Sequence, residues 1–163
     1  MDGVSVTRDT FRMMAFVPED LVSLPADGEW AAWVGCTCTP EGGRNAVVLV
    51  SITVTAFGTP RGAAGKALTA LLRARHPEGT ALIEEFTTPD GNPAVGVRRT
   101  VTQRVNGRDV VTGQAQAFVV YPEPGALGVV SGVSLCPDDL DNAAVLVTGI
   151  AAGMTVTCAP AAA

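Results

Sequence analysis

The sequence predicts an α+β domain: an antiparallel sheet of about six strands with two main helices, in the order β-β-α-β-β-β-β-α. Two observations lead to this prediction. Several segments alternate β-branched and polar residues, and the last four of them follow one another with only short turns between them, as in an antiparallel meander. Two other segments space their apolar residues for one face of a helix.

Length and charge limit the classes of protein. The 163 residues suffice for a single domain with its own core, and we expect residues 1–163 to form one. The net charge of −5 disfavours a surface for nucleic acid, which requires a basic excess. Apolar runs fall short of the roughly 20 residues that cross a bilayer, so we expect no membrane-spanning helix.

The N-terminus bears on cellular location. Residues 1–4, Met-Asp-Gly-Val, do not begin a basic region followed by an apolar one, so the sequence indicates no signal peptide and a cytoplasmic protein. The alternative is an exported protein or lipoprotein whose leader was removed before residue 1.

Three early segments are predicted strands. Phe11–Val17 and Trp30–Thr39 flank a stretch that contains prolines, and Val47–Phe57 is the clearest strand of the chain. In the last of these, alternate residues form an apolar face with serine and threonine opposite, which predicts a place inside the sheet. The members of that face are Val48, Val50, Ile52, Val54 and Ala56.

The first helix is predicted to begin at Thr59-Pro60, a capping oxygen followed by a proline in the first turn. Its apolar stripe comprises Ala64, Ala67, Leu68, Leu71 and Leu72. Basic residues gather before Pro77, where the helix dipole favours positive charge. The single histidine, His76, is therefore interpreted as a helix-terminal residue, because no partner for a catalytic triad is visible in the sequence.

The meander comprises Ala81–Thr88, Ala94–Val105, Val110–Tyr121 and Gly128–Leu135. Its hairpin at Asn106-Gly107 allows two registers. A two-residue turn pairs Val101 with Thr112 and Val97 with Gln116. A three-residue turn with Gly107 as a bulge pairs Val101 with Val111, Val97 with Ala115 and Val95 with Ala117. We favour the bulged turn, because it matches apolar residues with apolar residues.

That register gathers polar residues on the opposite face of the sheet: Arg98, Thr100, Thr102 and Arg104 beside Thr112, Gln114 and Gln116. The face is either an ordinary solvated one or a docking surface, on which Arg98 and Arg104 clamp a carboxylate or phosphate of a partner. Arg99 is predicted to point inward, with Glu84 or Glu85 as its structural ion-pair partner.

The second helix is predicted to begin at Asp138 or Asp139, where an acid caps free N–H groups. Its core stripe is Leu140, Ala143, Val147, Ile150, Ala151 and Met154. The outer side carries Val145, Thr148 and Ala152 without a lysine or glutamate, whereas an ordinary surface helix is charged there. We expect this side to be covered, either by the N-terminal segment or by a second protein chain.

The four cysteines, Cys36, Cys38, Cys136 and Cys158, have three interpretations. A zinc site lacks the usual two-residue spacing. A disulfide would join the Cys36/Cys38 pair to one of the other two. Buried free thiols are the favoured interpretation.

The order of elements is similar to that of the PsbP/LpqN-like superfamily. The resemblance rests on the strand pair, the helix that begins at Thr59-Pro60, the meander, and a closing helix entered through Val133-Ser134-Leu135-Cys136-Pro137-Asp138-Asp139. It covers residues 11–156, and residues 159–163 are expected to form a short flexible tail. The resemblance implies an α/β/α sandwich and a non-catalytic adaptor, in a superfamily that includes bacterial lipoproteins.

The function expected from the sequence is therefore non-enzymatic: a protein-interaction or adaptor domain that binds another protein or a second copy of itself. The partner-binding candidates are Arg98, Thr100, Thr102, Arg104, Gln114, Gln116, Val145, Thr148 and Ala152. We expect no cofactor and no metal. The alternative is a small-molecule or lipid-binding domain, whose apolar cup between sheet and helix is lined by Trp30, Trp33 and Phe118.

Overall fold

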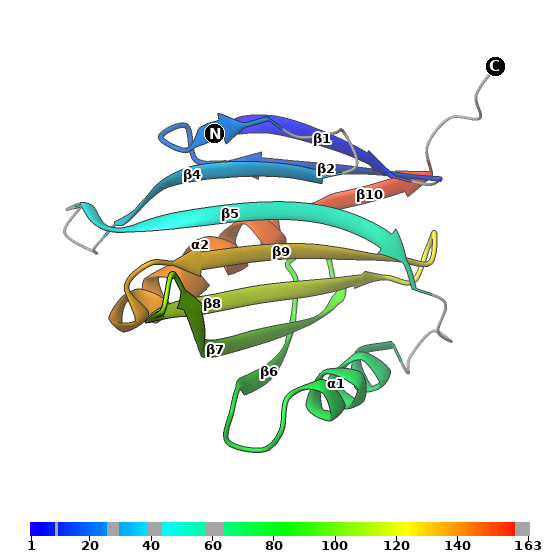
Figure 1. Ribbon diagram of the computed structural model, residues 1–163. Helices are drawn as coiled ribbons and strands as arrows, with labels where there is room; N and C mark the ends of the chain where they lie inside the picture. Colours follow the sequence, from blue (N-terminus) through cyan, green and yellow to red (C-terminus); the bar gives the residue numbers. More distant parts are fainter. Residues whose placement is uncertain (9, 26–29, 39–43, 58–63, 159–163) are drawn as a thin grey trace.

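A computed structural model describes residues 1–8, 10–25, 30–38, 44–57 and 64–158, and within them the chain forms ten strands and two α-helices (Figure 1). The strands are β1 (Asp2–Arg8), β2 (Phe11–Val17), β3 (Val22–Leu24), β4 (Trp30–Cys38), β5 (Arg44–Ala56), β6 (Leu82–Thr87), β7 (Pro93–Val105), β8 (Arg108–Tyr121), β9 (Ala126–Ser134) and β10 (Thr155–Cys158). The helices are α1 (Ala64–Arg75) and α2 (Leu140–Ala152), the latter preceded by the 3₁₀ turn η1 (Pro137–Asp139). The α+β class is confirmed, whereas the predicted first turn of α1 and the tail 159–163 lie outside the described residues.

The strands form two antiparallel sheets. One has seven strands in the order β3-β4-β5-β9-β8-β7-β6, and the other has three in the order β1-β2-β10. The prediction of about six strands omitted β1, β3 and β10. Strands β3 and β10 have only three and four residues, too few for a periodic signal. Strand β10 also pairs with β2 from the other end of the chain, a contact that local sequence does not encode.

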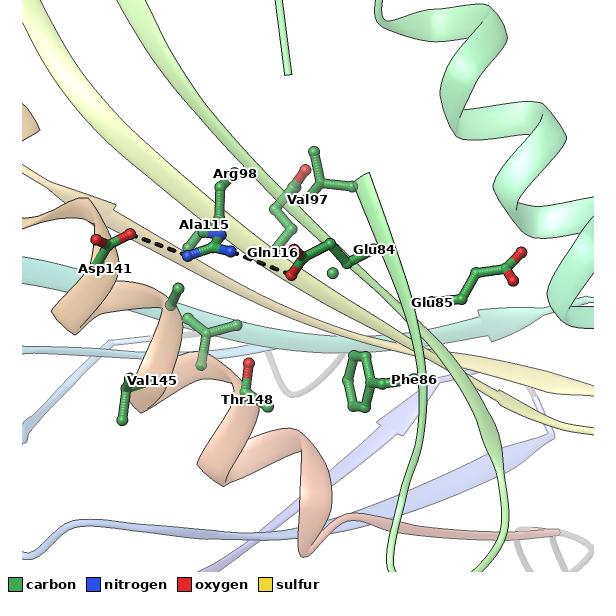
Figure 2. Close-up of a pocket in the computed structure, with 13 residues that line it drawn as sticks. Glu84, Glu85, Phe86, Val97, Arg98, Ala115, Gln116, Asp141, Val145 and Thr148 are labelled. Atoms are coloured by element: carbon green, nitrogen blue, oxygen red, sulfur yellow. Dashed lines mark hydrogen bonds and ion pairs between the residues drawn. The ribbon is translucent and has the colours of Figure 1, made fainter. Parts of the chain in front are cut away.

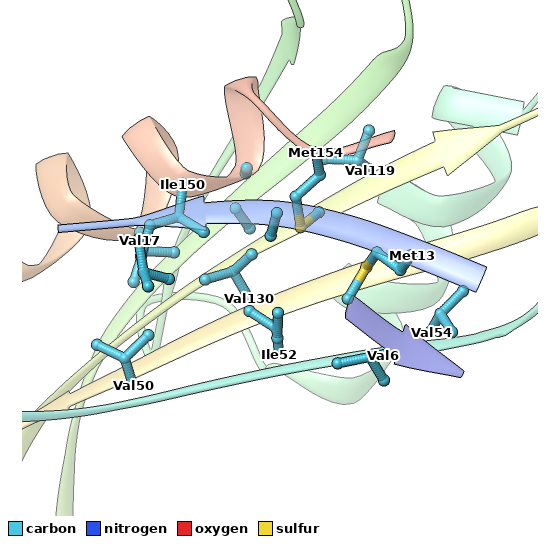
Figure 3. Close-up of a cluster of buried hydrophobic side chains, with 14 of the residues drawn as sticks. Val6, Met13, Val17, Val50, Ile52, Val54, Val119, Val130, Ile150 and Met154 are labelled. Atoms are coloured by element: carbon cyan, nitrogen blue, oxygen red, sulfur yellow. The ribbon is translucent and has the colours of Figure 1, made fainter. Parts of the chain in front are cut away.

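The two faces of the seven-stranded sheet are covered by different elements. Helix α2 and the three-stranded sheet lie on one face, and α1 lies on the other, beside β6 and β7 (Figure 1). The main core fills the space beneath α2 and β2, where Met13, Ile150 and Met154 meet Ile52 and its neighbours on β5 (Figure 3). A second cluster joins α1 to the opposite face.

The predicted buried face of β5 is confirmed at Val48, Val50, Ile52 and Val54, whose side chains are at most 1% exposed, but Ala56 at the strand end is exposed. In α1, Leu68 and Leu72 are buried while Leu71 is exposed. The stripe is therefore narrower than predicted. The reason is that α1 packs mainly against β6 and β7, at one edge of the sheet.

Glycines allow α2 to lie close to the sheet. A Cβ atom at Gly132 of β9 would lie 2.7 Å from Cγ2 of Val147, and one at Gly113 of β8 would lie 3.4 Å from Leu140. Gly128 similarly faces Met154. A larger residue at Gly132 would force Val147 or the helix to shift, because interiors are closely packed.

The register of the β7–β8 hairpin differs from the one we favoured. The turn has two residues, Asn106 and Gly107, with φ of 50° and 77°, as a type I′ turn requires. Val101 pairs with Thr112 and Val97 with Gln116, so the predicted bulge is wrong. The rule that apolar residues pair with apolar residues gave the wrong register because both faces of the sheet are buried in this region. Apolar residues then occur on both faces and do not identify which residues pair. Val95 and Val97 pack under α1, while Ala115 and Ala117 pack under α2.

A buried side-chain network holds the start of α2. Asp139 lies at the N-cap as predicted, but its side chain makes no capping bond to the helix backbone. Instead its carboxyl group accepts hydrogen bonds from the hydroxyl of Thr37 on β4 and from Nδ2 of Asn142 at 2.8 Å. Ser134 at the end of β9 lies 3.5 Å from the same carboxyl group. The network ties the junction before α2 to two strands.

The structure shows Cys36, Cys136 and Cys158 as free thiols. Burial was predicted for free thiols, and that prediction is wrong for Cys136 and Cys158, which are exposed at the edge of the junction before α2 and at the end of β10. The side chain of Cys38 lies outside the described residues. Within the described part of the chain, no three His, Cys, Asp or Glu side chains gather as a metal site requires.

Replacing Gly132 tests the close seating of α2. We expect Gly132→Ala to lower the free energy of unfolding by about 1–3 kcal/mol, because the added methyl group overpacks against Val147. Gly149→Ala is the control. Gly149 lies within α2 and is exposed, with nothing within 4 Å of an added Cβ, so alanine should stabilise the protein by about 0.5–1 kcal/mol. Urea unfolding of both variants makes the comparison. Equal stabilities would show that α2 is not closely seated.

Replacing Asp139 tests the buried network. Asp139→Ala should lower the free energy of unfolding by about 1–3 kcal/mol, because Thr37 and Asn142 lose their acceptor in a buried site. Asp138→Ala removes the neighbouring exposed acid and should change stability little. Thermal unfolding of the two variants under identical conditions measures the difference, and a neutral Asp139→Ala would contradict the role of the network.

A candidate binding groove beside the last helix

A groove of about 800 Å³ separates α2 from the edge of the seven-stranded sheet, and we call it the α2–β6 groove. Its walls are α2 on one side and β6 on the other, and its floor crosses β7 and β8 (Figure 2). The lining includes Phe86, Gly96, Ala115, Ala144, Val145 and Thr148, with Glu84, Arg98 and Asp141 at one end.

Small residues keep the floor of the groove open. Gly96 of β7 pairs with Glu84 of β6, and Ala115 of β8 pairs with Arg98. A Cβ atom at Gly96 would have nothing nearer than 3.9 Å, where it would meet Phe86 and the backbone oxygen of Glu84. A larger side chain at this position would therefore occupy the groove without clashing at its root. Glycine inside a strand often marks such an approach site.

The polar end of the groove is an ion cluster that has one cation and two carboxylates. Arg98 donates from Nη1 to Asp141 at 3.0 Å and from Nη2 to Glu84 at 3.1 Å (Figure 2). The Asp141 side chain is 90% exposed, so solvent screens the cluster and it adds little stability. Because Arg98 is already shared by two carboxylates, the cluster is better suited to a partner's cation than to a partner's carboxylate.

The outer side of α2 is bare. Val145 is 72% exposed, and Thr148 is also exposed, so the prediction that the N-terminal segment covers them is wrong. The N-terminal strands pack instead against the inner side of α2 and against β4 and β5. Only Ala152, near the end of the helix, is half-buried. Coverage by a second chain stays a prediction.

The predicted polar docking face is divided by the true register. Arg98, Thr100, Thr102 and Arg104 share the face of α2, and the last three are exposed toward the tip of the hairpin. Gln114 and Gln116 lie on the opposite face. A shift of one residue moves every side chain of a strand to the other side, which explains the separation.

The opposite face has its own hydrogen bonds. Arg99 donates from Nε to Gln114 at 2.7 Å, and Gln116 donates from Nε2 to Ser131 at 3.1 Å. The predicted ion pair of Arg99 with Glu84 or Glu85 is therefore wrong, because Glu84 contacts Arg98 and Glu85 accepts a hydrogen bond from Thr69. Of the nine candidates, Arg98, Val145 and Thr148 have side chains on the groove face, while Gln116 borders the groove only through its position on β8.

The predicted aromatic cup does not form. Trp33 is buried in the main core, whereas Trp30 is exposed and Phe118 packs with the α1 cluster on the other face of the sheet. The aromatic side chain of the groove is Phe86, which sequence reasoning missed. In the sheet, Phe86 pairs with Ala94, and its ring lies diagonally beside Gly96, where an added Cβ would be 3.9 Å from it. The glycine leaves room beside the ring, but this neighbourhood follows from the strand pairing and not from the local sequence.

His76 follows α1 and is not among the residues that line the groove. Partial burial lowers the pKa of its imidazole, and the positive charges of Arg99 and Arg75 lower the pKa further. Folded chains therefore bind this proton less tightly than unfolded ones, so folding stability decreases slightly as the pH falls below about 6.5. The helix-terminal position agrees with the prediction.

The architecture and the groove define the class of protein: an antiparallel α+β sandwich domain with a groove at one sheet edge. The fold is LpqN-like. The crystal structure of LpqN, a protein involved in cell envelope biogenesis of Mycobacterium tuberculosis, is similar with a TM-score of 0.56 and 17% sequence identity, over 96% of this chain and 91% of LpqN. No protein-family model matches the sequence, and no curated protein matches it. Membership of the wider PsbP-like group stays a prediction.

His76 offers a direct test of the electrostatics on the α1 face. We expect Arg99→Gln to raise the pKa of His76 toward its ordinary value of about 6.5, because a nearby positive charge is removed. Arg104→Gln, at the exposed tip of the hairpin, should leave it unchanged. Since the chain has one histidine, a proton NMR titration follows the imidazole without ambiguity. An unchanged pKa in Arg99→Gln would show that the two side chains are not close.

Proposed function

We propose that this chain is a non-enzymatic protein-interaction domain of the cell envelope, and that a segment of a partner protein binds in the α2–β6 groove. The observation that carries the proposal is the exposed apolar rim. Val145 is solvated in the isolated chain, beside a groove whose floor is Gly96 and Ala115. Apolar surface next to a concave site is characteristic of binding surfaces.

A non-enzymatic role is supported by the chemistry of the groove. Its charged groups, Glu84, Arg98 and Asp141, are paired with one another and lie partly in solvent. Catalytic acids and bases usually occupy desolvated sites that shift their protonation. The groove therefore has the features of a recognition surface: small residues, one aromatic ring and a charged end.

The envelope assignment draws on the likeness to LpqN, whose structure is described as that of a protein involved in cell envelope biogenesis. This likeness favours the exported alternative over the cytoplasmic location that the N-terminus suggested. In the described part of the chain, neither helix has the length and apolar character that crossing a bilayer requires.

A small-molecule or lipid ligand is the second candidate. Its support is the volume of the groove, about 800 Å³, which lies within the range of drug-sized ligand sites. The ring of Phe86 would contact such a ligand. Self-association through the bare side of α2 also stays a prediction, and both alternatives are outcomes of the same test.

The test places a photo-reactive amino acid at Val145 in cells that produce the protein. We expect cross-links to one partner protein, and we expect Gly96→Val to reduce them strongly because valine occupies the floor of the groove. A photo-reactive residue at Met14, exposed on the three-stranded sheet, is the matched control and should give no such product. Binding of the purified partner to wild type and to Gly96→Val then confirms the site.

Three results would overturn the proposal. Cross-links to lipid or to a small molecule would favour the second candidate. Cross-links to another copy of this chain, with a dimer in sedimentation experiments, would show self-association. Cross-linking that Gly96→Val leaves unchanged would place the partner outside the groove. Unfolding measurements on Gly96→Val must accompany the experiment, so that loss of binding is not confused with loss of structure.

A further inference from the structure

Strand β6 is an open edge of the seven-stranded sheet. It pairs with β7 on one side, and no described strand pairs with its other side. In an antiparallel strand, alternate residues direct both N–H and C=O away from the neighbour, so an edge strand offers a row of groups for a further strand. Leu82, at its start, is 51% exposed.

The side chains of β6 alternate between the two faces of the sheet. Glu84 and Phe86 lie on the face of α2, at the groove, whereas Ile83 and Glu85 lie on the face of α1. Glu85 accepts a hydrogen bond from Thr69 of α1 at 2.5 Å. The four central residues thus read apolar, acidic, acidic, apolar along the edge.

We propose that β6 accepts an extended, basic segment of the partner protein as an eighth, antiparallel strand. This inference rests on the proposed function, because the added strand borders the α2–β6 groove. Antiparallel pairing sets two basic residues opposite Glu85 and Glu84, and apolar residues opposite Phe86 and Ile83. The partner segment therefore has the pattern apolar-basic-basic-apolar, and its main chain completes the hydrogen bonds of the edge.

Charge selects the basic segment. Around the edge, three carboxylates (Glu84, Glu85 and Asp141) outnumber two cations (Arg98 and Lys66), which line the adjoining hollows. Asp141 is mostly exposed, so it is able to accept a further donor from the partner. The basic side chains Arg73 and His76 lie at the Leu82 end of the strand, away from this acidic centre.

The same charges disfavour a second copy of this chain. Antiparallel pairing of β6 with another β6 sets the two Glu84 side chains opposite each other in one register and the two Glu85 side chains opposite each other in the next, and like charges directly opposite are destabilising. Adjacent acidic residues on an edge therefore act against edge-to-edge aggregation. A basic strand instead places a positive charge opposite each of Glu84 and Glu85, which gives two favourable cross-strand pairs.

The added strand also uses the groove. Its residues opposite Glu84 and Phe86 direct their side chains to the face of α2, because side chains alternate along a strand. The basic side chain meets the Glu84–Asp141 end of the groove, and the apolar one meets Phe86 near its opening. Main-chain pairing supplies affinity, and these two contacts supply specificity.

The experiment uses the synthetic peptide fluorescein-Ser-Thr-Val-Lys-Lys-Val-Thr-Ser-amide and the purified full chain, with binding measured by the fluorescence anisotropy of the labelled peptide. We expect the Glu-Glu version of the peptide to bind about tenfold more weakly, since two attractive cross-strand pairs become repulsive. Methylating alternate peptide nitrogens, on the side that faces β6, should abolish binding because the main-chain donors are lost. Hydrogen exchange should slow at residues 82–87 on binding.

Protein variants supply the matched controls. The double variant Glu84→Lys, Glu85→Lys should reverse the preference, so that the Glu-Glu peptide binds better than the Lys-Lys peptide. Asp2→Lys with Asp109→Lys changes the net charge equally at exposed positions away from β6 and should leave the preference unchanged. Absence of binding by the Lys-Lys peptide, or binding that survives nitrogen methylation, would overturn strand addition.

The outcome separates this inference from the proposed function. Peptide binding that is lost on methylation but unaffected by Gly96→Val would support strand addition while removing the groove as the partner site. In the reverse result, Gly96→Val weakens binding of the partner protein, whereas the Lys-Lys and Glu-Glu peptides bind β6 equally well. That result would support the groove proposal and overturn strand addition.

Discussion

The close seating of α2 on glycine and alanine positions of β8 and β9 is the constraint on which the rest of this structure depends. Gly132 lies directly beneath Val147, and a larger residue there would force Val147 or the helix to shift. The helix therefore covers the centre of the sheet tightly and does not reach β6. Because β6 lies beyond the helix at the edge of the sheet, the α2–β6 groove remains open beside it.

The position of α2 also determines which of its residues meet solvent. The Asp139 network fixes the start of the helix to β4 and β9, and the core beneath Ile150 fixes its end. Rotation of the helix about its axis is thereby prevented. Val145 is held at the rim of the groove, where an ordinary surface helix would carry a charged residue.

Sequence reasoning succeeded where a pattern is local. The alternation along β5, the strands of the meander and the start of α2 near Asp139 were predicted because each depends on neighbouring residues. It failed at the β7–β8 register, because both faces of the sheet are covered there and apolar residues no longer identify a single buried face. That one-residue error moved Gln114 and Gln116 to the wrong face and assigned Arg99 an acid that belongs to Arg98.

The sequence by itself determined the α+β class, most strands, both helices and the uncharged outer side of α2. These features depend on periodicity and composition, which are set by residues that are close together in the sequence. Only the tertiary structure decided that this side is bare, that Phe86 and Gly96 form a groove with Val145, and that Glu84 and Asp141 share Arg98. Those contacts join residues far apart in the chain, and their geometry follows from the strand order and register, which local patterns leave undetermined.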